Sequence, residues 1–141
     1  MAGTLSEFKT MGEIALNAME AHANRIGIPG AAVFFYTDDE NAKDLCSMMR
    51  IVGASKTIAE DQSGYNFIAL AYSKLAESIE TGLDSGNITR PLIVGEYGYQ
   101  GSAVARMNGG LVIASFSGKT TGDVDFEVSK SGIKSLMDKG F

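Results

Sequence analysis

The chain has 141 residues, of which 45% are hydrophobic and 21% are charged, and its formal net charge is −5. This size and composition are typical of one globular domain, so we expect residues 1–141 to share a single hydrophobic core. The negative charge disfavours a nucleic-acid partner, which needs a basic face, and the lone cysteine, Cys46, can form neither an internal disulfide nor a thiolate metal cluster.

The first third of the chain predicts a helix and two strands. Apolar and small residues recur at steps of three and four over residues 5–26, as on one face of a helix. Gly27 favours the end of that helix. Residues 31–36, AAVFFY, are almost continuously apolar and indicate a strand covered on both faces. A short polar turn then favours an antiparallel second strand over residues 45–52.

The middle of the chain predicts a second helix and then an extended segment. Apolar positions over residues 65–81 have helical spacing, and Gly82 favours the helix end. Residues 91–94, PLIV, predict a short strand that begins at proline, where the missing N–H does least harm. Glycines recur every three residues over 95–101 and indicate a strand or hairpin kinked by glycine.

The last third predicts a hairpin and a final helix. Strands are expected over residues 104–107 and 111–116, joined by the turn Asn108-Gly109-Gly110. A helix is expected over residues 123–138, with Thr120 and Asp123 forming a capping box at its start. The order α-β-β-α-β-β-β-α predicts an α+β fold: a mainly antiparallel sheet of about five strands, flanked by helices in a profilin- or PAS-like layering.

Gly118-Lys119-Thr120 looks like the end of a phosphate-binding P-loop. That motif requires a glycine five residues before Gly118, where this chain has Ile113. The spacing therefore excludes a P-loop. Lys119 still lies in a glycine-flanked loop ahead of a helix N-terminus, where backbone N–H groups favour an anion.

Several short motifs match one known family. Gly109-Gly110 corresponds to its glycine turn, Phe116-Ser117-Gly118 to the end of its strand, and Asp125 and Glu127 to its Asp-x-Glu pair. These residues resemble the GlcG/HbpS-like (DUF336) family of small haem-binding or haem-degrading domains, which also supplies the C-terminal domain of PduO-type proteins. Weaker matches, among them Arg50, Gly53-Ala54 and Lys74-Leu75-Ala76, extend the resemblance over most of the chain.

The sequence also departs from the family pattern. Val112 and Ser115 stand where the family strand carries additional glycines, and the loop between Gly118 and Asp125 is one residue longer than is typical. The family's Gly-Gly-x-Pro segment has no counterpart. Glycines that line a cleft let a flat ligand approach the backbone, so these departures bear more on the ligand than on the fold.

The resemblance implies haem as cofactor, and it makes His22 the candidate axial ligand. The alternative is a core histidine with a local hydrogen bond. Met48, on the same strand face as Cys46, could supply a thioether ligand, although buried methionine and cysteine usually fill the core. Tyr97 and Tyr99 could stack on a porphyrin or bind its iron, or they could serve packing.

Three cations are candidates to pair with haem propionates or another small carboxylate: Lys74, Lys119 and Arg50. The acids at the start of the last helix have two interpretations. Asp123, Asp125 and Glu127 could complement the helix dipole, or two of them could perform acid–base chemistry. No group of histidines that could hold a metal exists, because His22 is the only histidine.

The leading hypothesis is a non-enzymatic domain that binds a small ligand, haem in the first place, for sequestration or sensing. The resemblance also implies a homo-oligomer. One alternative is an enzyme that degrades haem or acts on a small metabolite of a glycolate or diol operon; another is a structural subunit without a ligand. No membrane span is predicted, so we expect a soluble, cytoplasmic protein, or an extracellular or periplasmic one if an export signal was removed.

Overall fold

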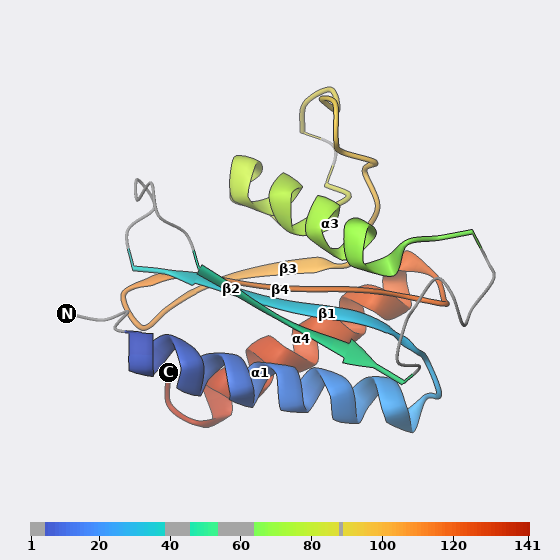
Figure 1. Cartoon of the computed structure of the whole chain (residues 1–141). Coiled ribbons are helices and arrows are strands. Elements are labelled where there is room, and N and C mark those ends of the chain that lie inside the picture. Colours follow the sequence, from blue (N-terminus) through green and yellow to red (C-terminus); the bar gives the residue numbers. More distant parts are fainter. Residues whose placement is uncertain (1–4, 39–45, 54–63, 88) are drawn as a thin grey trace.

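The computed structural model describes residues 5–38, 46–53, 64–87 and 89–141. Antiparallel strands form one sheet in the order β2-β1-β4-β3. Helices α1 and α4 cover one face of this sheet and α3 covers the other (Figure 1). The predicted α+β fold is therefore confirmed. The elements are α1 (Leu5–Arg25), β1 (Gly30–Thr37), β2 (Cys46–Val52), α3 (Phe67–Thr81), β3 (Ser102–Met107), β4 (Gly110–Gly118) and α4 (Gly122–Asp138).

The central strand β1 explains why residues 31–36 are apolar without alternation. Side chains of a strand point to opposite faces in turn, and both faces of β1 are covered by helices. Phe34 packs into the cluster beneath α1 and α4, whereas Phe35 packs into the cluster beneath α3. Every residue of β1 is buried. The prediction of a strand covered on both sides is confirmed.

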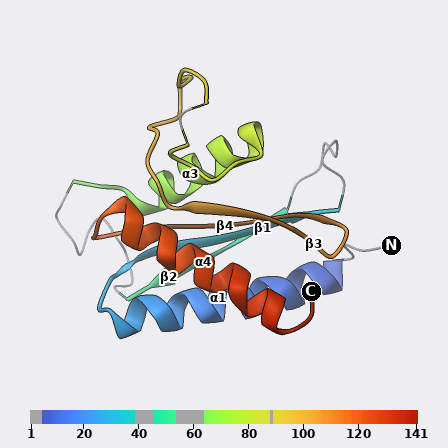
Figure 2. The same ribbon diagram turned by 180° about the vertical axis from the view of Figure 1, so that it is seen from behind.

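Helices α1 and α4 lie side by side on their face of the sheet (Figure 2). A Cβ atom on Gly132 of α4 would lie only 2.9 Å from Cγ of Met19, so the two helices approach closely there. The helical stripe predicted for residues 5–26 is buried over its middle, but Leu5 and Ile26 at its ends are 71% and 45% exposed. The helix is therefore packed through its central turns.

The β3–β4 hairpin turns at the predicted residues. Asn108 and Gly109 both have positive φ, 54° and 76°, as a type I′ hairpin turn requires. The capping residue of α4 differs from the prediction, because the N-cap is Thr121 and not Thr120. The Thr121 hydroxyl donates a hydrogen bond to the carboxylate of Asp123.

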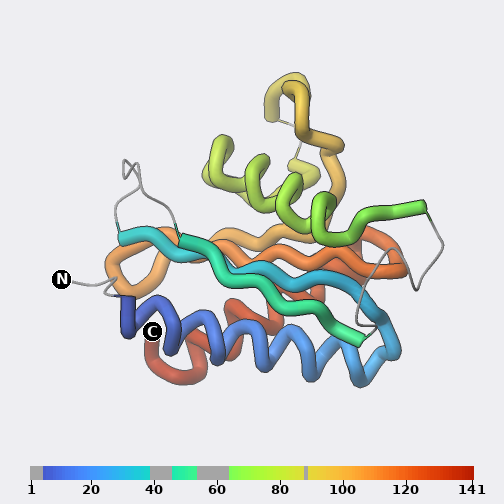
Figure 3. The backbone as a smooth tube through the Cα atoms, in the orientation of Figure 1, coloured from blue at the N-terminus to red at the C-terminus, as the bar shows by residue number. Residues whose placement is uncertain are grey.

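The strand predicted for residues 91–94 is wrong, and so is the strand or hairpin predicted for residues 95–101. Residues 89–101 form a loop that stands away from the sheet beyond α3 (Figure 3) and returns to it at Gly101, whose carbonyl oxygen accepts from the Phe116 N–H of β4. The described sheet therefore has four strands and not about five. Side chains replace the strand ladder here: Arg90 binds both carboxylate oxygens of Glu96, at 2.7 and 2.8 Å, and Glu96 accepts from the Ile93 N–H at 3.1 Å. The polar turn predicted after residue 37 lies mostly outside the described residues.

Candidate functional site

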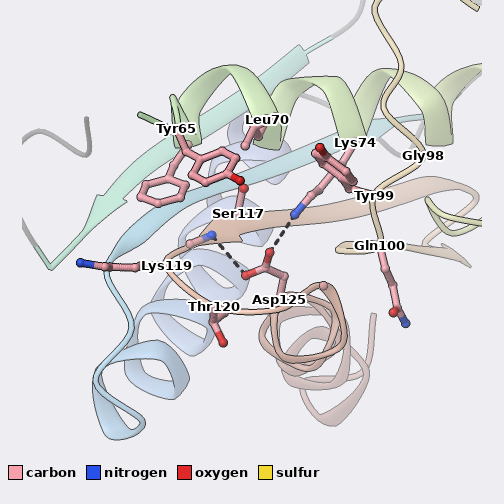
Figure 4. A pocket seen from close by; sticks show the side chains of 13 residues that line it. Tyr65, Leu70, Lys74, Gly98, Tyr99, Gln100, Ser117, Lys119, Thr120 and Asp125 are labelled. Atoms are coloured by element: carbon pink, nitrogen blue, oxygen red, sulfur yellow. Dashed lines mark hydrogen bonds and ion pairs between the residues drawn. The ribbon is translucent and has the colours of Figure 1, made fainter. Parts of the chain in front are cut away.

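A pocket of about 540 Å³ opens between α3, the end of the 89–101 loop and the segment that joins β4 to α4 (Figure 4). We call it the α3 pocket. Its volume lies within the range of small-molecule and cofactor sites. Aromatic and aliphatic side chains line one part and polar groups the other. The lining side chains include Tyr65, Phe67, Leu70, Tyr99, Lys74, Gln100, Ser117, Lys119, Thr120 and Asp125.

The start of α3 places the apolar part of this lining. The side chain of Asn66 accepts a hydrogen bond from the Ala69 N–H at 3.0 Å and so caps the helix. Phe67, Leu70 and Lys74 then follow at helical steps of three and four, which puts them along one face. The Tyr65 ring stacks on Phe67 with centroids 6.5 Å apart. A local cap thus orients an aromatic wall toward the pocket.

A buried ion pair forms the polar part of the α3 pocket. Nζ of Lys74 lies 2.8 Å from Oδ2 of Asp125, and each side chain is only 4% exposed. Lys74 also donates to the carbonyl oxygen of Phe116 at 3.1 Å. Oδ1 of Asp125 accepts from the Gly118 N–H at 3.1 Å. These bonds tie α3 and α4 to the end of β4 (Figure 4).

Burial dominates the electrostatics of this pair. It raises the pKa of Asp125 to about 6, although the Lys74 charge, its hydrogen bond and the Gly118 N–H all favour the carboxylate. Burial also lowers the pKa of Lys74, against the attraction of Asp125. Asp125 therefore titrates close to neutral pH. Besides the two roles predicted for Asp125, the structure shows a third, because its carboxylate forms an ion pair with Lys74 of α3.

Two glycines make room for this arrangement. A Cβ atom on Gly101, whose φ is 148°, would lie 2.7 Å from Nζ of Lys74. A Cβ on Gly118 would lie 2.7 Å from the carbonyl oxygen of Pro29. Both positions therefore require the absence of a side chain. Gly101 brings the backbone close to the ammonium group of Lys74, and Gly118 brings it close to the carboxylate of Asp125.

The structure brings three of the predicted site residues together in the α3 pocket. Lys74, Tyr99 and Lys119 all contribute to its lining, and the Lys119 side chain points away from the Lys74–Asp125 pair (Figure 4). Tyr97 does not line the pocket but stacks on Tyr99, with ring centroids 5.6 Å apart. Both tyrosines are about half exposed, at 58% and 47%.

The other predicted residues lie elsewhere. His22 is half-buried and lines a second pocket of about 600 Å³, between the end of α1, α4 and β3, together with Arg25, Phe126, Lys130 and Lys134. We call it the His22 pocket. Met48 is half-buried on β2 and packs against the core beneath α1. Arg50 binds Asn17 and Glu20 of α1, at 2.6 and 3.3 Å.

Sequence reasoning did not place Tyr65 and Phe67 in the site, and it did not pair Asp125 with Lys74. The two charged residues lie 51 positions apart, so no local spacing connects them. Among the described residues, no group of three or more His, Cys, Asp or Glu side chains could hold a metal ion. None of the described helices is long and apolar enough to cross a membrane.

The fold resembles solved structures at low sequence identity. PduOC, crystallised as a haem complex, matches with a TM-score of 0.61 and 12% identity over 96% of this chain and 95% of its own. The Klebsiella pneumoniae protein ORFY, a DUF336 protein, matches with 0.63 and 13% identity over 91% and 88%. A double mutant of Streptomyces reticuli HbpS matches with 0.55 and 16% identity over 96% and 88%.

No protein-family model matches the sequence, and no curated protein does. The likeness to solved structures spans nearly the whole chain. It confirms the fold that the sequence resemblance to GlcG/HbpS-like proteins predicted.

Proposed function

From a fold shared with GlcG/HbpS-like proteins, we propose that this chain belongs with them and binds a planar, carboxylate-bearing ligand in the α3 pocket. We propose haem as that ligand, and sequestration or sensing as the role. One observation carries the proposal: an aromatic and cationic pocket of about 540 Å³ lies in a fold that PduOC uses in its haem complex.

The lining suits a porphyrin. The half-exposed rings of Tyr65 and Tyr99 offer flat apolar surface, with the buried Phe67 ring behind Tyr65, and Lys74 and Lys119 offer positive charge for propionate groups. Of the residue types that bind haem iron, the described lining contains only tyrosine. Tyr99 or Tyr65 would therefore hold the iron there, and the bound haem would supply a redox-active metal centre.

His22 remains the second candidate for the axial ligand. Its pocket holds the cations Arg25, Lys130 and Lys134 beside the Phe126 ring, a set that could also receive a porphyrin and its propionates. The two sites predict different spectra, because phenolate and imidazole ligands differ in the visible bands of ferric haem.

A hemin titration of four proteins tests the proposal: wild type, Tyr65→Phe, Tyr99→Phe and His22→Ala. We expect a shifted Soret band that saturates near one equivalent and changes in one of the tyrosine variants but not in His22→Ala. A Soret band that changes only in His22→Ala would show that haem binds in the His22 pocket and not in the α3 pocket. No shift at stoichiometric hemin would contradict haem binding.

Catalysis is tested on the same complex. A protein that sequesters or senses haem leaves the absorbance of the bound cofactor constant when a reductant and oxygen are present. Progressive loss of the Soret band, absent in heat-denatured protein, would favour the haem-degrading alternative.

We also propose self-association. Ile93 and Val94, in the 89–101 loop, are 54% and 106% exposed, and exposed apolar residues at one place favour a protein contact. We expect analytical ultracentrifugation of the wild type to give a mass above the 14.9 kDa of one chain, at a whole multiple of it, and we expect Val94→Asp to lower that mass. A wild type that is monomeric at high concentration would contradict this.

A further inference from the structure

We propose that the Lys74–Asp125 pair is the carboxylate receptor of the α3 pocket, and that it couples capture of an anionic ligand to uptake of one proton. The inference rests on the proposed function only in taking the α3 pocket as the ligand site. It does not require the ligand to be haem. The ligand class is an aromatic carboxylate.

The ammonium group of Lys74 has the donors that a carboxylate receptor needs. A lysine ammonium has three N–H donors, and two of those of Lys74 have acceptors, Oδ2 of Asp125 and the carbonyl oxygen of Phe116. Lys74 also lines the α3 pocket. A ligand carboxylate can therefore accept the third N–H, and its position then lies beside the carboxylate of Asp125.

Two carboxylates that share one buried cation cannot easily both stay ionised. Asp125 is the carboxylate that becomes protonated, because burial already raises its pKa to about 6 and a second anion beside it raises that pKa further. At neutral pH, ligand binding therefore brings a proton to Asp125. The protonated carboxyl can still accept the Gly118 N–H.

The charged surroundings of Asp125 come from several elements. Lys74 reaches it from α3 and the Gly118 N–H from the end of β4. Asp123, on the same turn of α4, raises the pKa of Asp125 through its charge. Lys119, Tyr65 and Tyr99 line the same pocket. Asp123 is exposed, which makes it the matched control for Asp125.

The sign of the coupling is fixed by linkage. The free protein binds the proton below about pH 6, and the complex still binds it at higher pH. Between those two values, each decrease of one pH unit should lower Kd by up to about tenfold. Below about pH 6 both states are protonated, so Kd should become constant.

Isothermal titration calorimetry with three probes tests this: hemin, pyrenebutyrate and the neutral pyrenebutanol. Each is titrated at pH 7 in phosphate and in Tris, whose ionisation enthalpies differ, so the difference in observed heat counts protons. We expect uptake approaching one proton for pyrenebutyrate and none for pyrenebutanol. In Asp125→Asn the uptake should vanish, whereas Asp123→Asn, which removes only the smallest of the charge effects on Asp125, should retain it.

The outcomes separate this inference from the haem proposal. If pyrenebutyrate binds with proton uptake and hemin does not bind, haem is the wrong ligand and the coupling stands. Carboxylate binding without proton uptake, or uptake that persists in Asp125→Asn, overturns the coupling even if hemin binds. If neither carboxylate binds, both proposals fail. If Asp125→Asn does not fold, the pH dependence of the pyrenebutyrate Kd of the wild type keeps the coupling falsifiable, because a Kd that stays constant above about pH 6 overturns it.

Discussion

At the scale of single residues, Lys74 and Asp125 combine a structural role with the proposed binding role. They connect α3 and α4 across the end of β4, and each is only 4% exposed. Removing one partner of a buried pair is far more costly than removing both, because the remaining charge loses its compensation. The two roles can therefore be separated by comparing single with double substitutions.

Lys74→Met should destabilise the protein by roughly 3–5 kcal/mol at pH 7. The double variant Lys74→Gln/Asp125→Asn should lose considerably less. Urea unfolding followed by circular dichroism measures both. Lys134→Met is the control, since the Lys134–Asp138 pair is exposed and its loss should cost under about 0.5 kcal/mol. Equal losses in Lys74→Met and Lys134→Met would contradict the buried-pair account.

The pH dependence of stability has a definite sign. The folded pKa of Asp125, about 6, lies above its ordinary value of 3.8, so the folded chain holds this proton more tightly than the unfolded chain. The contribution of this proton to the free energy of unfolding is fully present below pH 3.8 and is lost as the pH rises through 6. At 1.36 kcal/mol per pH unit the loss is about 3 kcal/mol.

Unfolding of the wild type and of the double variant at pH 4, 5, 6 and 7 measures this loss. The free energy of unfolding of the wild type, relative to the variant, should decrease from pH 4 to pH 7. A relative stability that increases over this range would mean that ion pairing, and not burial, controls Asp125.

At the scale of elements, the end of β4 lies close to the segment that joins α1 to β1, and this approach positions the Gly118 N–H that donates to Asp125. Gly118→Ala would place a Cβ 2.7 Å from the Pro29 carbonyl oxygen and 2.7 Å from the Phe116 ring. Neither neighbour can move without shifting the strand, so we expect a loss of roughly 1–3 kcal/mol. Weaker binding in the α3 pocket should accompany it, because the Gly118 N–H holds Asp125.

Gly12→Ala is the matched comparison. Its Cβ would meet Sδ of Met48 at 2.9 Å, but that side chain is flexible, and alanine favours a helix interior by about 1 kcal/mol. We expect a net change within about 1 kcal/mol by thermal unfolding. A larger loss in Gly12→Ala than in Gly118→Ala would show that backbone approach at β4 is not the constraint.

At the scale of the whole molecule, the sequence predicts the elements better than the site. The run 31–36 indicates a strand covered on both sides, and Asn108-Gly109 indicates the hairpin turn, because both signals are local. Residues 91–94 carry a strand-like composition, but Arg90 and Glu96 close a loop through side chains. Such a competing interaction has no signal in apolar periodicity.

The site depends on contacts between distant segments. Lys74 and Asp125 each stand out in the sequence, yet their pairing results from α3 and α4 meeting at the end of β4. His22 has the chemistry of an iron ligand, but the fold places it in a different pocket from Tyr99. Residue type thus suggests the chemistry, and the topology decides which residues can act together.

The central claim is that a haem-like ligand occupies the α3 pocket. Nuclear magnetic resonance of the ¹⁵N-labelled protein with gallium(III) protoporphyrin, a diamagnetic haem analogue, tests it most directly. We predict that amide shifts concentrate in residues 65–74, 98–101 and 117–125. Shifts confined to residues 22–25 and 126–134, around His22, or no shifts at all, would contradict the claim.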